Sequence, residues 1–158
     1  MRLGTADARI GYDPWLHTRQ EIETLEKALA DSGIGLIAVD RNPLDVVWAD
    51  RPSPPVGQAR IHDDALAGET SADKRARLAA ELQEQGQAAA LLTLPDSISW
   101  LLNIRGSDVP KNPIVQSFAV LSDDGHLALF ADPAKFDDAL RAHLGKPVIL
   151  GIRPEAIT

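Results

Sequence analysis

The side chains best suited to chemistry lie in one polar segment between residues 103 and 113. It reads Asn-Ile-Arg-Gly-Ser-Asp-Val-Pro-Lys-Asn-Pro and stands between an apolar predicted helix and an apolar predicted strand. Loops at the ends of such elements often carry binding groups. The planar guanidinium of Arg105 suits carboxylates and peptide carbonyls, and Asp108 could attract an amine. Arg105, Asp108 and Asn112 are therefore candidate substrate-binding residues. An Arg105–Asp108 pair that only braces the loop is an equally weighted alternative.

The other chemistry-bearing residues form no recognisable catalytic or metal site. The histidines lack the i, i+4 spacing of a helix-borne zinc pair, and the neighbouring aspartates at 63–64, 123–124 and 137–138 point apart in a helix or strand. The sequence contains no cysteine, no Gly-x-Ser-x-Gly elbow and no phosphate-binding loop. We predict no catalytic residue and no metal ligand in this chain.

Composition sets wider limits on function. The chain has 158 residues, 44% of them hydrophobic, which suffices for one domain or two small ones. A net charge of −7 gives no reason to expect binding to nucleic acid or to anionic membranes. No apolar run is long enough to span a bilayer, and the first residues do not resemble a secretion signal. We therefore expect a soluble cytoplasmic protein.

The elements that must position these residues begin with a strand–helix–strand unit. A strand is predicted over residues 9–12, and Thr18 with Glu21 forms a capping-box pattern at the start of a helix that ends near Asp31 or Ser32. The apolar run 34–39 is typical of a strand buried on both faces. The proline-rich stretch 50–57 that follows favours an interdomain linker over a surface loop.

A second series of elements follows the linker. Periodicity predicts a helix over 72–85 capped by Thr70 or Ser71, a buried strand over 88–93 and a helix over 95–103. Two strands, 114–121 and 126–131, flank a turn at 122–125. One helix is predicted from Pro133 to Gly145 with Phe136, Leu140 and a partly buried His143 facing inward, before a last strand over 147–152. The pattern indicates a mixed α/β fold.

Four blocks of this sequence form a distinctive set. They are residues 11–18 (Gly-Tyr-Asp-Pro-Trp-Leu-His-Thr), 47–52 (Val-Trp-Ala-Asp-Arg-Pro), 67–70 (Ala-Gly-Glu-Thr) and 98–110 (Ile-Ser-Trp-Leu-Leu-Asn-Ile-Arg-Gly-Ser-Asp-Val-Pro). Together, and in this order, they resemble aminopeptidase P, the Xaa-Pro aminopeptidase family. The resemblance implies two creatinase-like N-terminal domains, each related to ribonuclease H, before a pita-bread catalytic domain. That domain holds two metal ions, usually manganese, and releases the N-terminal residue from peptides with proline second.

The resemblance also implies a domain map. Residues 1–55 correspond to the closing part of the first N-terminal domain, and residues 56–145 to most of the second. The loop from Arg105 to Asn112 is then expected to face the catalytic cleft, where it would limit peptide length and orient the peptide amine. The tail 146–158 is instead similar to a segment that follows the ATPase domain in ATP-binding subunits of sugar-type ABC importers.

The departures from the family pattern carry expectations of their own. No part of the sequence resembles the catalytic domain, so we expect a fragment that is inactive alone and holds no metal. The incomplete first sheet should leave an apolar face and a strand edge uncovered, which favours self-association. The alternatives are a stand-alone binding or assembly module with a creatinase-like fold and, with less support, a piece of a transporter's regulatory machinery.

Overall fold

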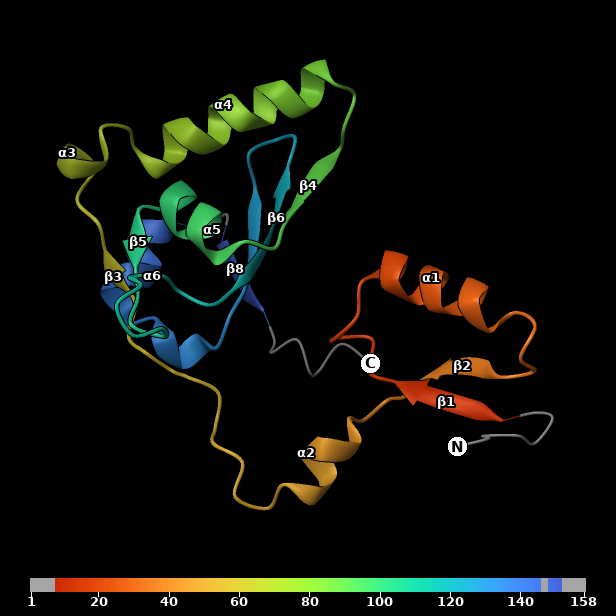
Figure 1. Ribbon diagram of the computed structural model, residues 1–158. Helices are drawn as coiled ribbons and strands as arrows, with labels where there is room; N and C mark the ends of the chain where they lie inside the picture. Colours follow the sequence, from red (N-terminus) through yellow and green to blue (C-terminus); the bar gives the residue numbers. More distant parts are fainter. Residues whose placement is uncertain (1–7, 146–147, 152–158) are drawn as a thin grey trace. The chain divides into compact units, whose positions relative to one another are not determined.

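The computed structural model describes residues 8–145 and the backbone of residues 148–151, in two compact units that divide between Ser53 and Pro54. The first unit contains β1 (Arg9–Tyr12), α1 (Arg19–Leu29), β2 (Gly35–Ala38) and α2 (Pro43–Val47) (Figure 1). Strands β1 and β2 pair in parallel, with Arg9 opposite Gly35 and Tyr12 opposite Ala38. The predicted strand–helix–strand unit is therefore confirmed.

Helix α1 begins with the predicted capping box. The backbone N–H of Glu21 donates to the Thr18 hydroxyl at 3.2 Å, and the Glu21 carboxylate accepts the Thr18 backbone N–H at 2.7 Å. This backbone hydrogen bond lowers the pKa of Glu21 because it stabilises the charged carboxylate. The helix ends at Leu29, earlier than predicted, because Ser32 turns back and donates from its backbone and its hydroxyl to the Leu29 carbonyl.

The first unit has little core. Ile22 is the buried apolar side chain among its described residues, and Ile10 and Ile37 are 44% and 45% exposed. The prediction that residues 34–39 are buried on both faces is therefore wrong, because α1 covers only one side of a two-stranded sheet. Helix α2 was missed: the Asn42 side chain accepts the Leu44 N–H, and Pro43 occupies the first turn.

The second unit is built on a mixed four-stranded sheet. Its strands are β4 (Ala89–Leu92), β6 (Phe118–Ser122), β7 (Leu127–Phe130) and β8 (Val148–Gly151), in the order β4-β6-β7-β8. The first two pairings are antiparallel, and β7 and β8 run parallel. The predicted hairpin turn is confirmed: Gly125 has a φ of +81°, and its N–H donates to the Ser122 carbonyl at 3.0 Å. A separate antiparallel ribbon joins β3 (Arg60–Ile61) to β5 (Ile104–Arg105).

Helices supply the rest of the core of this unit. They are α3 (Asp64–Ala67), α4 (Ser71–Glu84), α5 (Pro95–Leu101), the 3-10 helix η1 (Pro133–Lys135) and α6 (Asp138–Leu144), and all except η1 are labelled in Figure 1. The predicted cap of α4 is confirmed, since the Thr70 hydroxyl accepts the Asp73 N–H. Apolar side chains of α4, α5 and α6 meet one face of the sheet. The helix residues in this core include Leu82, Ile98, Leu101 and Leu140, and the sheet residues include Ala119, Leu121, Leu127 and Leu129. This is the predicted mixed α/β fold.

Two predicted elements are shorter than expected. The strand predicted over 114–121 begins only at Phe118, because side chains hold the preceding backbone: Ser99 accepts the Val115 N–H and Asp108 accepts the Gln116 N–H. The helix predicted from Pro133 breaks at Phe136 and restarts after Asp137, whose carboxylate caps α6. The break shifts the helical phase, so Leu144 is buried and His143 is exposed, contrary to the prediction.

Strand β4 also differs from its prediction. It was expected to be buried, but its residues alternate between exposed and half-buried, and Leu91 is 70% exposed. The reason is its place at an end of the sheet, with helices on one face only. Most of the tail 146–158 lies outside the described residues, although the backbone of β8 is placed beside β7.

Among the described residues, no helix combines the length and apolar character needed to cross a membrane.

Candidate functional site

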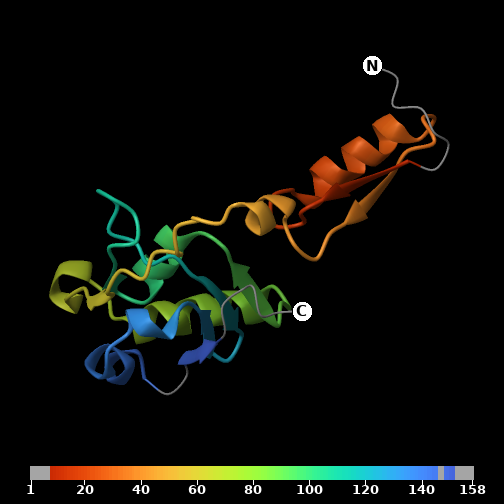
Figure 2. The same ribbon diagram turned by 90° about the horizontal axis from the view of Figure 1, so that it is seen from below.

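The polar segment singled out in the sequence forms a narrow loop in the second unit. Figure 2 shows it extending from the body of that unit. Val109 and Asn112 form an isolated bridge, with the Asn112 N–H donating to the Val109 carbonyl at 3.1 Å. Lys111, at the turn, has a φ of +64°. At the end of the loop away from this turn, the Gly106 N–H donates to the Pro113 carbonyl at 3.2 Å and closes the base of the loop.

Asp108 anchors this loop inside the protein. Its carboxylate is fully buried and forms an ion pair with Lys135 at 2.7 Å. The same carboxylate accepts the backbone N–H of Gly57 at 3.0 Å and that of Gln116 at 2.7 Å. Three donors therefore satisfy a charge that would be costly to bury alone. Asp108 thus connects the loop to three places in the second unit: its first residues, the segment that leads into β6, and η1.

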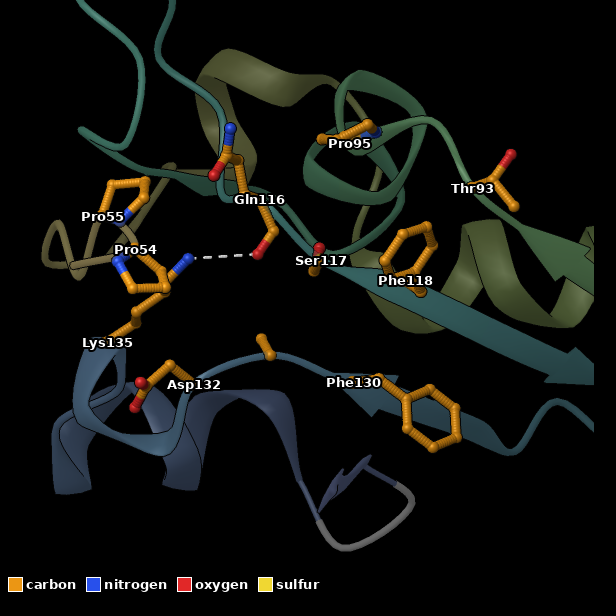
Figure 3. Close-up of a pocket in the computed structure, with 11 residues that line it drawn as sticks. Pro54, Pro55, Thr93, Pro95, Gln116, Ser117, Phe118, Phe130, Asp132 and Lys135 are labelled. Carbon is orange, nitrogen blue, oxygen red and sulfur yellow. Dashed lines mark hydrogen bonds between the residues drawn. The ribbon is translucent and has the colours of Figure 1, made fainter. Parts of the chain in front are cut away.

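Lys135 connects the anchor to a pocket of about 340 Å³. Its ammonium donates to the Gln116 carbonyl at 3.1 Å (Figure 3). The same ammonium donates to Asp108. The pocket walls are mainly apolar: Pro54 and Pro55 stand at one end, and Phe118 and Phe130 stand at the other. The register of the sheet places these two phenylalanines opposite each other on β6 and β7. The pocket therefore has mainly apolar walls, and Lys135, which is paired with Asp108, also lines it.

The structure separates the three predicted site residues. Arg105 is half-buried, and its guanidinium donates to the Ile104 carbonyl at 2.8 Å. Asn112 is half-buried near the turn, beside a hollow of about 380 Å³ lined by loop residues. Asp108 lies below both and is paired with Lys135. The bracing pair between Arg105 and Asp108 does not occur among the described residues. Arg105 and Asn112 keep polar groups at the surface, and Asp108 holds the loop that carries them.

A second buried cation supports the other side of the loop, and sequence reasoning missed it. The Lys74 ammonium donates to the Asn103 side chain at 2.6 Å and to the Trp100 carbonyl at 2.9 Å, and lies 4.4 Å from the Trp100 ring centroid. Burial lowers the pKa of Lys74. Asn103, whose φ is +50°, donates to Asp64 and to the Glu69 carbonyl. Lys74 shares a helix face with Leu78 and Leu82, and this i, i+4, i+8 spacing was the available signal.

The described residues do not form a metal site. No group of three or more histidine, aspartate or glutamate side chains in that part of the chain could hold a metal ion. The buried carboxylate of Asp108 is already bonded to Lys135 and two backbone amides. The donor set of the described residues therefore does not fit a di-metal centre.

Comparisons with known proteins identify the family of this domain. Residues 50–156 match the creatinase/prolidase N-terminal domain family. The probable Xaa-Pro aminopeptidases P of Neosartorya fischeri and Aspergillus flavus are 37% and 36% identical to this chain over 142 residues. In each case the match covers 89% of this chain and 22% of the relative.

A solved structure gives the same assignment. The crystal structure of X-prolyl aminopeptidase from Caenorhabditis elegans, described as a cytosolic enzyme with a di-nuclear active site, is 32% identical and superposes with a TM-score of 0.81. The match covers 97% of this chain and 25% of that one, so this chain spans about a quarter of the length of the enzyme it matches. The chain belongs to the creatinase/prolidase N-terminal domain family.

Proposed function

We propose that this chain serves as the non-catalytic N-terminal region of an Xaa-Pro aminopeptidase, a hydrolase that releases the N-terminal residue from peptides with proline second. The observation that best supports this proposal is the structural likeness to the Caenorhabditis elegans enzyme, which covers 97% of this chain at a TM-score of 0.81. The family match, which names an N-terminal domain, supports the same role. By analogy with that cytosolic enzyme, we place this protein in the cytoplasm.

The proposal includes a division of labour within the chain. Residues 1–55 are the closing part of a first creatinase-like domain, and residues 56–145 are most of a second. The likeness of 146–158 to an ABC importer subunit stays a resemblance of sequence, because the family match runs to residue 156. The small core and half-exposed isoleucines of the first unit support self-association through its two-stranded sheet.

Hydrolysis itself is assigned outside the described residues. The Caenorhabditis elegans enzyme is described as having a di-nuclear active site, and we propose a pair of divalent metal ions, manganese, for the intact enzyme of this lineage. The described part of this chain offers no donor set for such a pair. Its role is to shape the peptide cleft.

The loop from Arg105 to Asn112 is the proposed contact with the peptide. Arg105 has guanidinium donors beyond the one bonded to Ile104, and these suit peptide carbonyls or a C-terminal carboxylate. Asn112 offers both a donor and an acceptor beside the hollow at the turn. Asp108 contributes as a positioning residue, because its carboxylate is already occupied by three protein donors.

A chimaera tests this proposal. This chain replaces the matching segment of the Caenorhabditis elegans enzyme, and release of the first residue from Xaa-Pro peptides of increasing length is measured. We expect the chimaera to remain active, and Arg105→Ala to raise KM for longer peptides about tenfold by removing a charged hydrogen bond. Arg19→Ala, on the exposed face of α1, is the matched control.

Clear outcomes would reject the proposal. A folded chimaera without activity would favour a binding or assembly module that is not part of a peptidase. Equal effects of Arg105→Ala and Arg19→Ala would remove the loop from the peptide contact. This chain alone, assayed with added manganese, should release no product, and turnover that a chelator abolishes would contradict the proposed division of labour.

A further inference from the structure

Asn103 is a buried polar residue at the point where the chain passes from α5 into the β3–β5 ribbon. It is 1% exposed, and its φ of +50° lies in the left-handed region, which asparagine and glycine tolerate better than other residues. The Asn103 carbonyl accepts the His62 N–H at 2.7 Å, and the pairing of the two strands continues to Arg60 opposite Arg105. The conformation of Asn103 therefore determines where this ribbon begins.

The side chain of Asn103 uses its oxygen and both of its N–H groups within the protein. The oxygen accepts the Lys74 ammonium at 2.6 Å. The nitrogen donates to the Asp64 carboxylate at 2.7 Å and to the Glu69 carbonyl at 2.8 Å. Only an amide can both accept and donate in this way, since a carboxylate only accepts. One side chain thus joins a cation of α4, a carboxylate of α3 and the segment between these two helices.

Arg105 depends on the backbone that Asn103 fixes. It follows Asn103 by two residues, and its guanidinium donates to the Ile104 carbonyl at 2.8 Å, so it lies against the chain that leaves Asn103. We propose that Asn103 is a positioning residue for Arg105 and thereby sets how strongly the enzyme prefers longer peptides. This inference rests on the proposed function, in which Arg105 contacts the peptide.

The two buried anchors of the loop hold different parts of it. Asp108 lies three residues after Arg105 and is bonded to the start of the second unit, to η1 and to the segment that leads into β6. Asn103 lies before Arg105 and is bonded to α3, to α4 and to the chain after β3. Loss of the Asn103 side chain should therefore displace Arg105 and leave the ion pair between Asp108 and Lys135 in place.

Kinetics of the chimaera that carries this chain test the positioning role. Asn103→Gly removes the amide but keeps a residue that adopts the left-handed φ easily. We expect KM for longer peptides to rise by up to about tenfold, the effect expected of Arg105→Ala, while kcat stays unchanged. Because both residues act through one contact, Asn103→Gly should raise KM no further when Arg105→Ala is already present.

Leu127→Ala is the matched control for a general loss of stability. Leu127 is 1% exposed on β7 of the same unit, so its truncation should destabilise the unit without changing how KM depends on peptide length. A length-dependent rise in KM with Leu127→Ala equal to that with Asn103→Gly would overturn the proposal. Fully additive effects of Asn103→Gly and Arg105→Ala would also overturn it.

An exchange of amide and carboxylate tests the hydrogen bond to Asp64. Asn103→Asp places two carboxylates together at this bond, and it should raise KM for longer peptides. Adding Asp64→Asn returns an amide donor to the bond, so the double variant should recover part of the loss, although the Glu69 carbonyl still lacks its donor. A double variant with no lower KM than Asn103→Asp alone would contradict the positioning role.

Hydrogen exchange of the full chain separates this inference from the proposed function. The His62 amide should exchange faster in Asn103→Gly than in the wild type, whereas the Gln116 amide, which is bonded to Asp108, should not change. If Arg105→Ala raises KM but the His62 amide exchanges at the wild-type rate in Asn103→Gly, only this inference is overturned. If Arg105→Ala leaves KM unchanged, the proposed peptide contact is rejected, and the positioning role is overturned with it.

Discussion

At the scale of single residues, Asp108 has more influence on the candidate loop than any group at its surface. Its carboxylate joins residues that are far apart in sequence, Gly57, Gln116 and Lys135, while Arg105 and Asn112 depend on the backbone that it fixes. A buried ion pair adds little net stability compared with an apolar pair, but removing one partner leaves the other charge buried and unpaired. Replacing only Asp108 should therefore destabilise the protein more than replacing both Asp108 and Lys135 with apolar residues.

Asp108→Ala should lower the free energy of unfolding by about 3–5 kcal/mol, because Lys135 would remain buried without its carboxylate. The double variant Asp108→Leu with Lys135→Met should recover part of that loss, since no charge is then left unpaired although the amides of Gly57 and Gln116 still lose their acceptor. Urea unfolding of both variants measures the difference. A double variant less stable than Asp108→Ala would contradict the role of the pair.

Lys74 makes stability depend on pH. Burial lowers the pKa of Lys74 in the folded state below the 10.5 of an exposed lysine. The unfolded chain therefore binds more protons between these two pKa values, and the folded state gains stability as pH rises through that interval. The difference in unfolding free energy between the wild type and Lys74→Met should shift in favour of the wild type up to about pH 10.5. A pH-independent difference would argue against this account.

Sequence reasoning singled out Arg105, Asp108 and Asn112 but did not predict that Asp108 is buried and paired with Lys135. The segment from 103 to 113 stood out because polar residues interrupt two apolar stretches. The partner of Asp108 was not predictable, because Lys135 lies 27 residues away and nothing in its neighbourhood indicates burial. Arg105 was the closer candidate in sequence, and the fold selected the more distant cation.

At the scale of elements, close backbone approach fixes the shape of the loop. A Cβ added at Gly106 would collide with the backbone carbonyl of Ile114, and one added at Gly57 would lie 2.7 Å from the Ser107 carbonyl carbon. Backbone atoms cannot move aside as the end of a flexible side chain can. Glycine is therefore required at position 106, where the two sides of the loop base meet, and at position 57, where the start of the second unit meets the loop.

Gly106→Ala should destabilise the second unit by about 1–3 kcal/mol, because the added methyl group must displace backbone. Gly35→Ala is the matched control, since nothing lies within 4 Å of its added Cβ. Thermal unfolding of the two variants provides the comparison. An equal loss of stability in both would show that the close approach is not limiting.

The elements also show where periodicity fails as a guide. Helix α1 and α4 were predicted correctly at their starts because Thr18 and Thr70 cap them locally. The break at Phe136 was missed because a local pattern allowed one helix through Pro133 and Leu140, while the Asp137 carboxylate starts a new one. Local caps therefore fixed all of these helix starts, including the restart after Asp137, which the apolar periodicity did not reveal.

At the scale of the whole molecule, the two units differ in how much apolar surface they bury. The second unit has a connected core from three helices and a sheet, whereas Ile22 is the buried apolar residue in the described part of the first. Local opening costs least free energy where few apolar contacts must break. The first unit should therefore open at a lower free-energy cost than the second.

Native-state hydrogen exchange should show this difference. Amides in β1 and β2 should exchange at least about tenfold faster than those in β6 and β7, because the first unit can open without disrupting the larger core. Ile22→Ala should accelerate exchange in β1 and β2 and leave the rates in β6 and β7 unchanged. Matching rates in both units would mean that the chain unfolds as one cooperative body.

The position of Lys135 has a consequence for synthesis on the ribosome. Asp108 needs an amide from residue 57, an amide from residue 116 and a cation from residue 135. The nascent chain has the first of these early but the last only when most of the second unit has been translated. Until then the carboxylate must stay hydrated, so the loop that it anchors acquires its final form late, after the helices and the hairpin that precede η1 have emerged.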